Sequence, residues 1–258
     1  FFYKIIFIKL LKKKLITTFG RKSFFIKTLS IFKNSFSTFL IILKINFKYS
    51  FIFLPKIIFS IYFIEFKTSK KNYLKQIYCF DHKDWLSVNY DVWKKYLSNF
   101  TKINYLEIGS FEGRSAVFVG ELSNTKKITC VDTFEGSDEH NEINFQKVYE
   151  NCSNNLNQLK NINTSLIKST SDNFFSQNQL NFNVIYIDGS HFCEDVKRDF
   201  VNSYNCLEKN GILICDDFLW SYYKSLKDNP MAAILDCYQN YKKNLKVEFL
   251  NYQIIFKK

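Results

Sequence analysis

The chain has 258 residues, 47% of them hydrophobic, so it can bury a sizeable core. Only 7 glycines and 2 prolines are present, which argues against a linker or a disordered protein. The formal net charge is +12, but residues 1–80 hold 16 basic residues and one acidic residue, and the remainder holds 20 and 23. The basicity therefore belongs to the N-terminal segment, and no nucleic-acid partner is expected.

Residues 1–78 form a basic, apolar extension in which lysines interrupt aromatic and aliphatic stretches. No uncharged apolar run reaches the ~18–20 residues of a membrane-spanning helix. Lys44, Lys48 and Lys56 divide the best candidate, and Pro55 is expected to break it again. Two interpretations stay open: a segment that lies on the membrane surface, and a helical cap packed on the rest of the chain. The first residue is Phe1 rather than Met, so we expect the natural chain to begin earlier.

The seven cysteines show no C-x-x-C pair and no zinc-site spacing. This usage favours a reduced, cytoplasmic compartment, with peripheral contact at the cytoplasmic face of a membrane if residues 1–78 are interfacial. The sequence gives no information on the oligomeric state.

Strand-like and helix-like segments alternate through residues 79–258. This alternation predicts a Rossmann-like, doubly wound α/β domain with a mostly parallel sheet. The last two strands are too close for a helical crossover, so they are expected to pair as an antiparallel hairpin. The predicted strands span 103–108, 127–132, 164–168, 183–188, 211–216, 245–250 and 252–256, and the predicted helices span 82–100, 113–122, 142–159, 172–176, 193–207 and 231–241.

A glycine-containing turn follows the first strand of this domain. Glu107 ends the strand, and Gly109 and Gly113 follow before a helix begins. Glycine lets the backbone turn tightly and lets a ligand approach the main chain, and a helix N-terminus adds partial positive charge. The spacing G-x-x-x-G differs from the G-x-G-x-x-G of nicotinamide-dependent dehydrogenases. A plain structural turn is the alternative.

An acidic residue, Asp132, ends the second strand. An acidic side chain at this tip is placed to accept hydrogen bonds from ribose hydroxyls. Capping of the segment that follows is the alternative. The glycine turn and Asp132 together indicate a nucleoside-containing cofactor.

Three aspartates follow two further strands: Asp188 after the fourth, and Asp216 and Asp217 after the fifth. The carboxyl ends of neighbouring parallel strands line one crevice, so these carboxylates are expected to converge and to repel one another unless a cation joins them. Hard oxygen ligands suit Mg²⁺. His191, three residues after Asp188, is a candidate general base. Helix capping and solvent exposure are the alternatives for the aspartates.

These segments resemble the class I S-adenosylmethionine-dependent methyltransferases, in particular the group built around E-I-G-S-x-x-G-x-S and I-D-G-x-H. The matching pieces are residues 105–115 (YLEIGSFEGRS), 131–137 (VDTFEGS), 185–191 (IYIDGSH) and 211–217 (GILICDD), and residues 247–258 (VEFLNYQIIFKK) resemble the final hairpin of that fold. The resemblance covers roughly residues 80–258 and does not reach the N-terminal segment.

The resemblance implies that the backbone around Gly109, including Ser110 and Gly113, holds the methionine part of S-adenosylmethionine. It places Glu107 near the amino group of the cofactor and Asp172 near its adenine. Catechol-type and macrocin-type O-methyltransferases of this superfamily hold a divalent metal at the strand tips, which implies Asp188, Asp216 and Asp217 as ligands and His191 at the position of a catalytic base. Ser190 stands where macrocin-type enzymes often carry an acidic residue.

We therefore expect methyl transfer from S-adenosylmethionine to an oxygen, assisted by Mg²⁺, with Asp188 and His191 at the reacting centre. A sugar or glycan hydroxyl, or another small molecule, is the expected acceptor. Three alternatives remain: a metal-independent class I methyltransferase acting on another acceptor, a nicotinamide-dependent dehydrogenase, whose G-x-G-x-x-G motif is absent, and a non-catalytic, membrane-associated module that binds the cofactor.

Overall fold

The computed structural model describes residues 21–68, 73–136 and 142–258, and the side chains of residues 21–24 lie outside this description. The chain divides into two compact units, residues 1–67 and 68–258. Residues 73–78, which the sequence analysis assigns to the extension, are part of the second unit.

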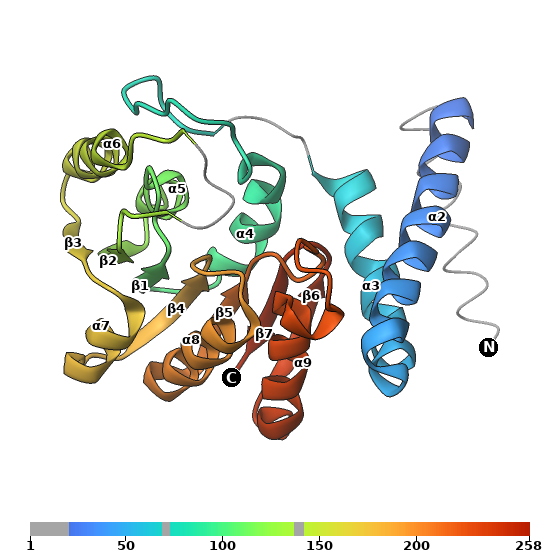
Figure 1. Ribbon diagram of the computed structural model, residues 1–258. Helices are drawn as coiled ribbons and strands as arrows, with labels where there is room; N and C mark the ends of the chain where they lie inside the picture. The colour runs from blue at the N-terminus through green and yellow to red at the C-terminus, as the bar shows by residue number, and fades with distance from the viewer. Residues whose placement is uncertain (1–20, 69–72, 137–141) are drawn as a thin grey trace. The chain divides into compact units, whose positions relative to one another are not determined.

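Two long helices make up the described part of the first unit. Helix α2 spans Arg21–Ile45, and α3 spans Phe47–Lys67. Only Asn46 separates them; its side-chain Oδ1 accepts the Tyr49 N–H at 3.1 Å at the start of α3. The two helices lie side by side and antiparallel (Figure 1). The helical N-terminal extension is thus confirmed.

One expectation for this unit was wrong. Pro55 lies inside α3 and does not end it. A proline removes a single hydrogen-bond donor from the helix, and the rest of the helix continues on both sides of it. Among the described residues, two segments, 25–45 and 47–67, are long and apolar enough to cross a membrane by length and composition alone.

A seven-stranded sheet forms the centre of the second unit, in the order β3-β2-β1-β4-β5-β7-β6 (Figure 1). The first five strands are parallel, and β7 runs antiparallel to both β5 and β6. The predicted Rossmann-like sheet with an antiparallel C-terminal hairpin is therefore confirmed. The strands span Ile103–Ile108, Thr125–Asp132, Asn163–Lys168, Phe182–Ile187, Leu207–Cys215, Lys246–Leu250 and Ile254–Lys257.

Helices flank this sheet (Figure 1). The α-helices are α4 to α9, and short 3₁₀ turns precede α4 and α9. In chain order, the helices α4 to α9 span Tyr90–Leu97, Arg114–Gly120, Phe145–Asn157, Ser171–Gln177, Cys193–Cys206 and Pro230–Tyr241, and the 3₁₀ turns span Ser87–Asn89 and Leu226–Asp228.

The central strands read as nearly continuous apolar runs because both of their faces are covered. In β4, Val184, Ile185, Tyr186 and Ile187 are all buried. Trp93 of α4 is fully buried; its ring meets Tyr186 edge-on at 4.7 Å, and its indole N–H donates to the Gln253 side chain at 2.8 Å. The indole thereby ties α4 to the centre of the sheet and to the C-terminal hairpin.

The helix predicted over 82–100 is only partly correct, because the chain is irregular before the 3₁₀ turn at Ser87. The backbone amides of Asp81 and His82 donate to the buried Glu112 carboxylate at 2.8 and 3.2 Å. The Asp84 carboxylate accepts the amides of Leu86 and Ser87. Side chains thus take the amides that a helix would have used, and the helix starts after them.

Candidate active site

The glycine turn after β1 lies where strand order reverses, between β1 and β4. A Cβ added to Gly109 would lie 1.9 Å from the carbonyl oxygen of Asp188 and 2.7 Å from the Gly189 Cα. Gly109 also has a φ of +84°, and its N–H donates to the Val131 carbonyl at 2.9 Å. No side chain fits here, so the loops that follow β1 and β4 meet backbone to backbone at the topological switch point, where ligands bind in open α/β sheets.

A buried carboxylate lies directly beneath this turn. Glu107 is fully buried, accepts a hydrogen bond from the Ser115 hydroxyl of α5, and has the Cys130 thiol 3.7 Å away. Burial raises the pKa of Glu107 to about 8, and the Ser115 hydrogen bond opposes that rise. A cationic group placed beside this carboxylate would favour its charged form.

Asp132, at the tip of β2, holds the glycine turn in place. Its Oδ2 accepts the amides of Ser110 and Phe111, both at 2.8 Å, and its Oδ1 accepts the amide of Phe134 at 2.7 Å. The capping alternative is thus realised in the structure. A carboxylate has about four acceptor positions, so three backbone donors leave room for one further donor such as a ribose hydroxyl.

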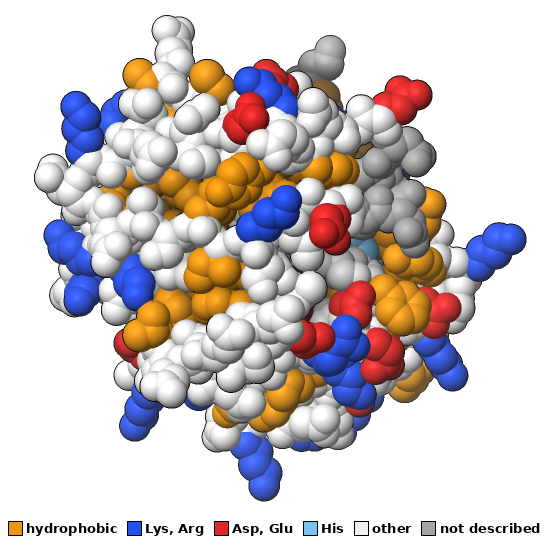
Figure 2. Space-filling view, turned by 60° about the vertical axis from the view of Figure 1, so that its left-hand side comes forward, with side chains coloured by type: hydrophobic (Ala, Val, Ile, Leu, Met, Phe, Trp, Pro, Cys, Tyr) orange, Lys and Arg blue, Asp and Glu red, His pale blue; other side chains and the backbone are white. Residues whose placement is uncertain are grey.

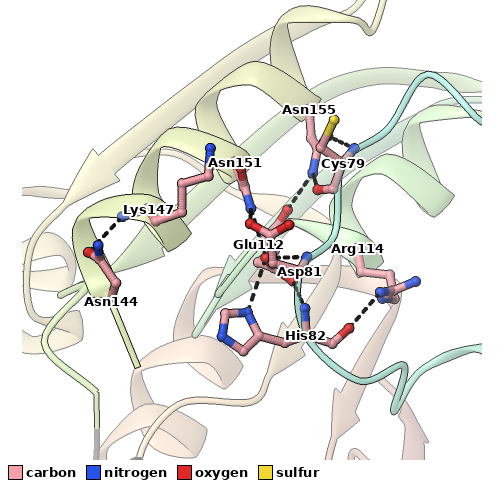
Figure 3. A network of polar contacts seen from close by, with 9 residues as sticks. All are labelled: Cys79, Asp81, His82, Glu112, Arg114, Asn144, Lys147, Asn151 and Asn155. Atoms are coloured by element: carbon pink, nitrogen blue, oxygen red, sulfur yellow. Dashed lines mark hydrogen bonds and ion pairs between the residues drawn. The ribbon is translucent and has the colours of Figure 1, made fainter. Parts of the chain in front are cut away.

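The sequence analysis missed a second polar network on the other side of the turn (Figure 3). The Glu112 carboxylate, 2% exposed, accepts the amide groups of Asp81 and His82 and the side-chain amide of Asn151, and it lies 3.1 Å from His82 Nδ1. Asn155 joins the same network through the Glu112 and Cys79 carbonyls. These contacts bind the irregular segment before α4 to the glycine turn. In the sequence, the acidic Glu112 beside Gly113 in the glycine turn was the one signal for these contacts.

At the tips of β4 and β5 the structure brings together Asp188, His191 and Asp217. One ligand atom from each lies within 4.8 Å of the others, and His191 Nε2 is 2.7 Å from Asp217 Oδ2. Asp217 has a φ of +54°, a conformation that is unusual for a residue other than glycine. All three side chains are partly buried. Two carboxylates and an imidazole are a donor set that suits a divalent cation.

Asp216 was predicted to be a metal ligand, but in the structure its carboxylate accepts hydrogen bonds from neighbouring residues. Its Oδ2 accepts the Gln253 side-chain amide at 2.7 Å and the Tyr186 hydroxyl, and its Oδ1 accepts the Asp217 amide at 2.8 Å. Asp216 is the last acceptor in a series of hydrogen bonds in which Trp93 donates to Gln253 and Gln253 donates to Asp216. Asp216 therefore fixes the tip of β5, and His191 takes its place in the convergent group.

The clustered carboxylates carry a clear electrostatic cost. Burial, followed by the charges of Asp216 and Asp217, raises the pKa of Asp188 well above its usual range. Burial and Asp217 raise the pKa of Asp216 to about 6, although hydrogen bonds from Tyr186 and Gln253 oppose the rise. These groups favour a proton or a cation between them.

The remaining predicted residue, Asp172, lies in the first turn of α7. Its carboxylate pairs with Arg198 of α8 at 3.2 Å, and both side chains are about half exposed. Across the described residues, no hydrogen bond or ion pair joins Asp172 to the glycine turn. A neighbouring buried carboxylate, Asp199, escaped the sequence analysis; it lies near Gly189, and burial raises its pKa to about 7.

A cluster of aromatic side chains lies beside His191, and it was also missed. The ring of Trp220 lies 4.6 Å from that of His191 and stacks on Tyr222 at 5.4 Å. Tyr223 and Phe192 extend the cluster, and Tyr222 and Phe192 are 55% and 40% exposed. The spacing of these residues carries no periodic pattern, so only the fold shows that they meet.

Comparison with known proteins bears on this same region. Residues 106–218 match the family model described as a methyltransferase domain. The match includes the glycine turn, Asp132 and the aspartates after β4 and β5. It supports a methyltransferase in this part of the chain. No curated protein sequence matches the chain.

Several solved structures share the fold. An O-methyltransferase from Bacillus cereus in complex with SAH is 14% identical, with a TM-score of 0.43 over 65% of this chain and 77% of that one. A protein from Streptococcus mutans described as a methyltransferase, in complex with SAH, is 14% identical, with a TM-score of 0.48 over 68% and 98%. The O-methyltransferase NovP is 12% identical, with a TM-score of 0.45 over 63% and 74%. These values are too low to assign an activity or a ligand to this chain.

The close approach at Gly109 gives a first prediction. Gly109→Ala should lower the free energy of unfolding by about 2 kcal/mol or more, because the new methyl group forces the β1 and β4 loops apart at a positive φ. Denaturant unfolding measures the change. Gly189→Ala is the matched control: its Cβ would lie 3.4 Å from the Ile108 side chain and 3.6 Å from the Asp199 carboxylate, and both are ordinary contacts. Equal stabilities of the two variants would contradict the backbone contact.

The buried Glu107 gives a second prediction. Its folded pKa of about 8 lies above the ordinary value of 4.5, so the folded chain keeps a proton that the unfolded chain loses, and stability falls as the pH rises between these values. Glu107→Gln removes this titration. Relative to wild type, its free energy of unfolding should therefore rise by up to about 3 kcal/mol between about pH 5.5 and about pH 8.5. The exposed Glu150→Gln is the control, and parallel pH profiles for wild type and Glu107→Gln would contradict the assignment.

Proposed function

We propose that this protein is an S-adenosylmethionine-dependent methyltransferase that methylates a hydroxyl oxygen. The observation that carries the proposal is the position of the methyltransferase-domain match, which spans the switch point where Gly109 touches the Asp188 carbonyl. A cofactor that contains a nucleoside is held by the close approach of a glycine backbone on one side and by an acidic side chain, which binds the ribose hydroxyls, on the other. Gly109 and Asp132 supply these two features from adjacent strands.

The residues present fit the cofactor. The backbone from Gly109 to Gly113, with Ser110, is the proposed cradle for the methionine part, and Glu107 beneath it is the proposed counter-charge for the amino group. Asp132 keeps one acceptor position for the ribose. Asp172 is proposed to lie near the adenine; its pair with Arg198 is exposed and can rearrange at little cost.

The bound cofactor supplies an electrophilic methyl group that needs no further activation. The protein must therefore hold the acceptor hydroxyl in line with that group and remove its proton. Asp188, His191 and Asp217 lie together at the strand tips beside the glycine turn, where they can contact such a hydroxyl. Asp217 orients the imidazole of His191 through their 2.7 Å contact.

A divalent cation is part of this proposal. Asp188, Asp217 and His191 would hold it, and Asp216 would support them through Asp217. When bound, such an ion lowers the pKa of an acceptor hydroxyl and orients it. The raised pKa of Asp188 and the convergence of three donor atoms favour this arrangement.

A second candidate is a metal-independent methyltransferase in which His191 is the general base. The direct contact between His191 and Asp217 favours it, because a carboxylate that holds an imidazole stabilises the protonated form. In this candidate the hydrogen bonds from Tyr186 and Gln253, rather than a cation, offset the repulsion between Asp188 and Asp216.

A sugar or glycan hydroxyl is the proposed acceptor class. Trp220 lies beside His191 and Tyr222 stacks on Trp220, and aromatic rings of this kind suit the apolar side of a sugar ring. A nucleic-acid acceptor is disfavoured by charge. Of the 36 basic and 24 acidic residues, 13 and one lie in residues 1–67, which leaves 23 of each sign in the second unit. Basic and acidic side chains both appear on the face shown in Figure 2.

Cofactor binding is the direct test. Isothermal titration should show binding of S-adenosylmethionine and no binding of NAD. Asp132→Asn should raise the dissociation constant by about tenfold or more, since the variant loses an acceptor and loosens the glycine turn. Asp236→Asn, on the exposed side of α9, is the control. Unchanged affinity in Asp132→Asn would remove Asp132 from the cofactor site.

Chelation decides between the two mechanisms. If the mechanism uses a divalent cation, EDTA should abolish methyl transfer and Mg²⁺ should restore it. Cofactor affinity should stay within about twofold, because the ion binds the acceptor and not the cofactor. His191→Ala should then regain part of its activity at high Mg²⁺. Full activity in EDTA, with His191→Ala inactive at every Mg²⁺ concentration, would favour the metal-independent candidate.

A further inference from the structure

The helical hairpin of α2 and α3 has large apolar side chains on its outer surface and hydroxyl residues among its buried ones. Among the side chains described in α2, only Ser35, Thr38 and Ile42 are buried, and two of these carry hydroxyl groups. Phe25, Phe32 and Phe36 of the same helix are 63%, 71% and 62% exposed. In a water-soluble helix pair, the aromatic residues would be inside and the hydroxyl residues outside.

Helix α3 is mixed, because its buried residues include the large apolar Phe53, Ile57 and Ile61 as well as two serines. Ser50 and Ser60 are fully buried, and the Ser50 hydroxyl donates to the Phe47 carbonyl of its own helix at 2.7 Å. Phe47, Phe51 and Ile52 are 71%, 53% and 51% exposed. Small hydroxyl residues inside a helix pair, with large apolar residues outside, are typical of helices that pack together within lipid.

The lengths agree with the same environment. Each apolar segment, 25–45 and 47–67, has 21 residues. At 1.5 Å per residue this is about 30 Å, close to the thickness of a bilayer's hydrocarbon core. The segments are not the core helices of a soluble protein, because only 17% and 39% of their most apolar windows are buried.

The charges of the hairpin fit an anionic lipid surface. Helices α2 and α3 hold eight basic residues and one acidic residue, Glu65. Glu65 is engaged within the hairpin, where its carboxylate accepts the Ser30 hydroxyl at 2.5 Å. Lys44 and Lys48 flank the turn between the helices, and Lys67 ends α3. Lys33 and Lys56 lie farther from the ends, and the Lys56 amino group lies 5.8 Å from the centre of the Phe59 ring.

We propose that α2 and α3 form a membrane anchor whose exposed aromatic and aliphatic side chains lie among lipid acyl chains, with the lysines near the helix ends at anionic headgroups. This goes beyond the interfacial contact expected from the sequence. That expectation rested on charge interruptions, whereas the structure adds two continuous helices, both of which expose large apolar side chains. The occupant of the exposed faces is thus a lipid bilayer.

The test uses the full chain and vesicles of phosphatidylcholine containing phosphatidylglycerol. The wild-type chain should float with the vesicles and remain bound through high salt and alkaline carbonate. The double variant Phe32→Glu, Ile52→Glu places one carboxylate on the exposed face of each helix and should reduce the bound fraction at least about tenfold. Leu180→Glu is the matched control, because Leu180 is 49% exposed but lies in the second unit, and it should float like wild type.

A second measurement keeps the result independent of folding. In a Phe36→Trp variant, the added fluorescence should be quenched by lipids brominated on their acyl chains, whereas that of Leu180→Trp should not. Release of the wild-type chain by high salt would show surface adsorption and overturn the proposal. A chain that stays in solution as an oligomer without detergent would also overturn it, since a second copy would then cover the exposed faces.

Discussion

The candidate site depends on one contact between two stretches of backbone. Gly109 and the carbonyl of Asp188 approach so closely that even a methyl group is excluded. This contact joins the loop after β1 to the loop after β4 at the point where the sheet reverses its strand order. The glycine turn and the aspartate tips are therefore parts of one structure, and a shift of either loop moves both.

Polar side chains then hold each loop in its place. Asp132 takes two amides of the glycine turn from one side, and Glu112 takes two amides of the preceding segment from the other. Asp216 is fixed by Gln253 and Tyr186, and Gln253 is itself bonded to the buried Trp93. A carboxylate that accepts several hydrogen bonds in this way is held in one position, and so are the groups beside it, including Asp217.

The sequence predicted the sheet well because apolar runs and strand tips are local signals. The strands of the first βαβ units, the turn at Gly109 and the closing hairpin all follow from patterns a few residues long. The segment before α4 did not, because its amides bond to Glu112, about 30 residues away in sequence. The same holds for Asp216: its proximity to Asp188 was predictable from topology, but its partner Gln253 lies in the final hairpin. Pro55 shows the reverse case, a local signal that the surrounding helix overrides.

The central claim is that the cofactor lies across the tips of β1 and β2, with its reactive end toward Asp188. A crystal structure of the full chain with bound S-adenosylhomocysteine tests it most directly. The account predicts that the ligand's ribose contacts Asp132, its amino acid part lies against the backbone of Gly109, and its sulfur faces the group formed by Asp188, His191 and Asp217. A ligand bound elsewhere on the fold, or bound with its sulfur turned away from that group, would contradict the account.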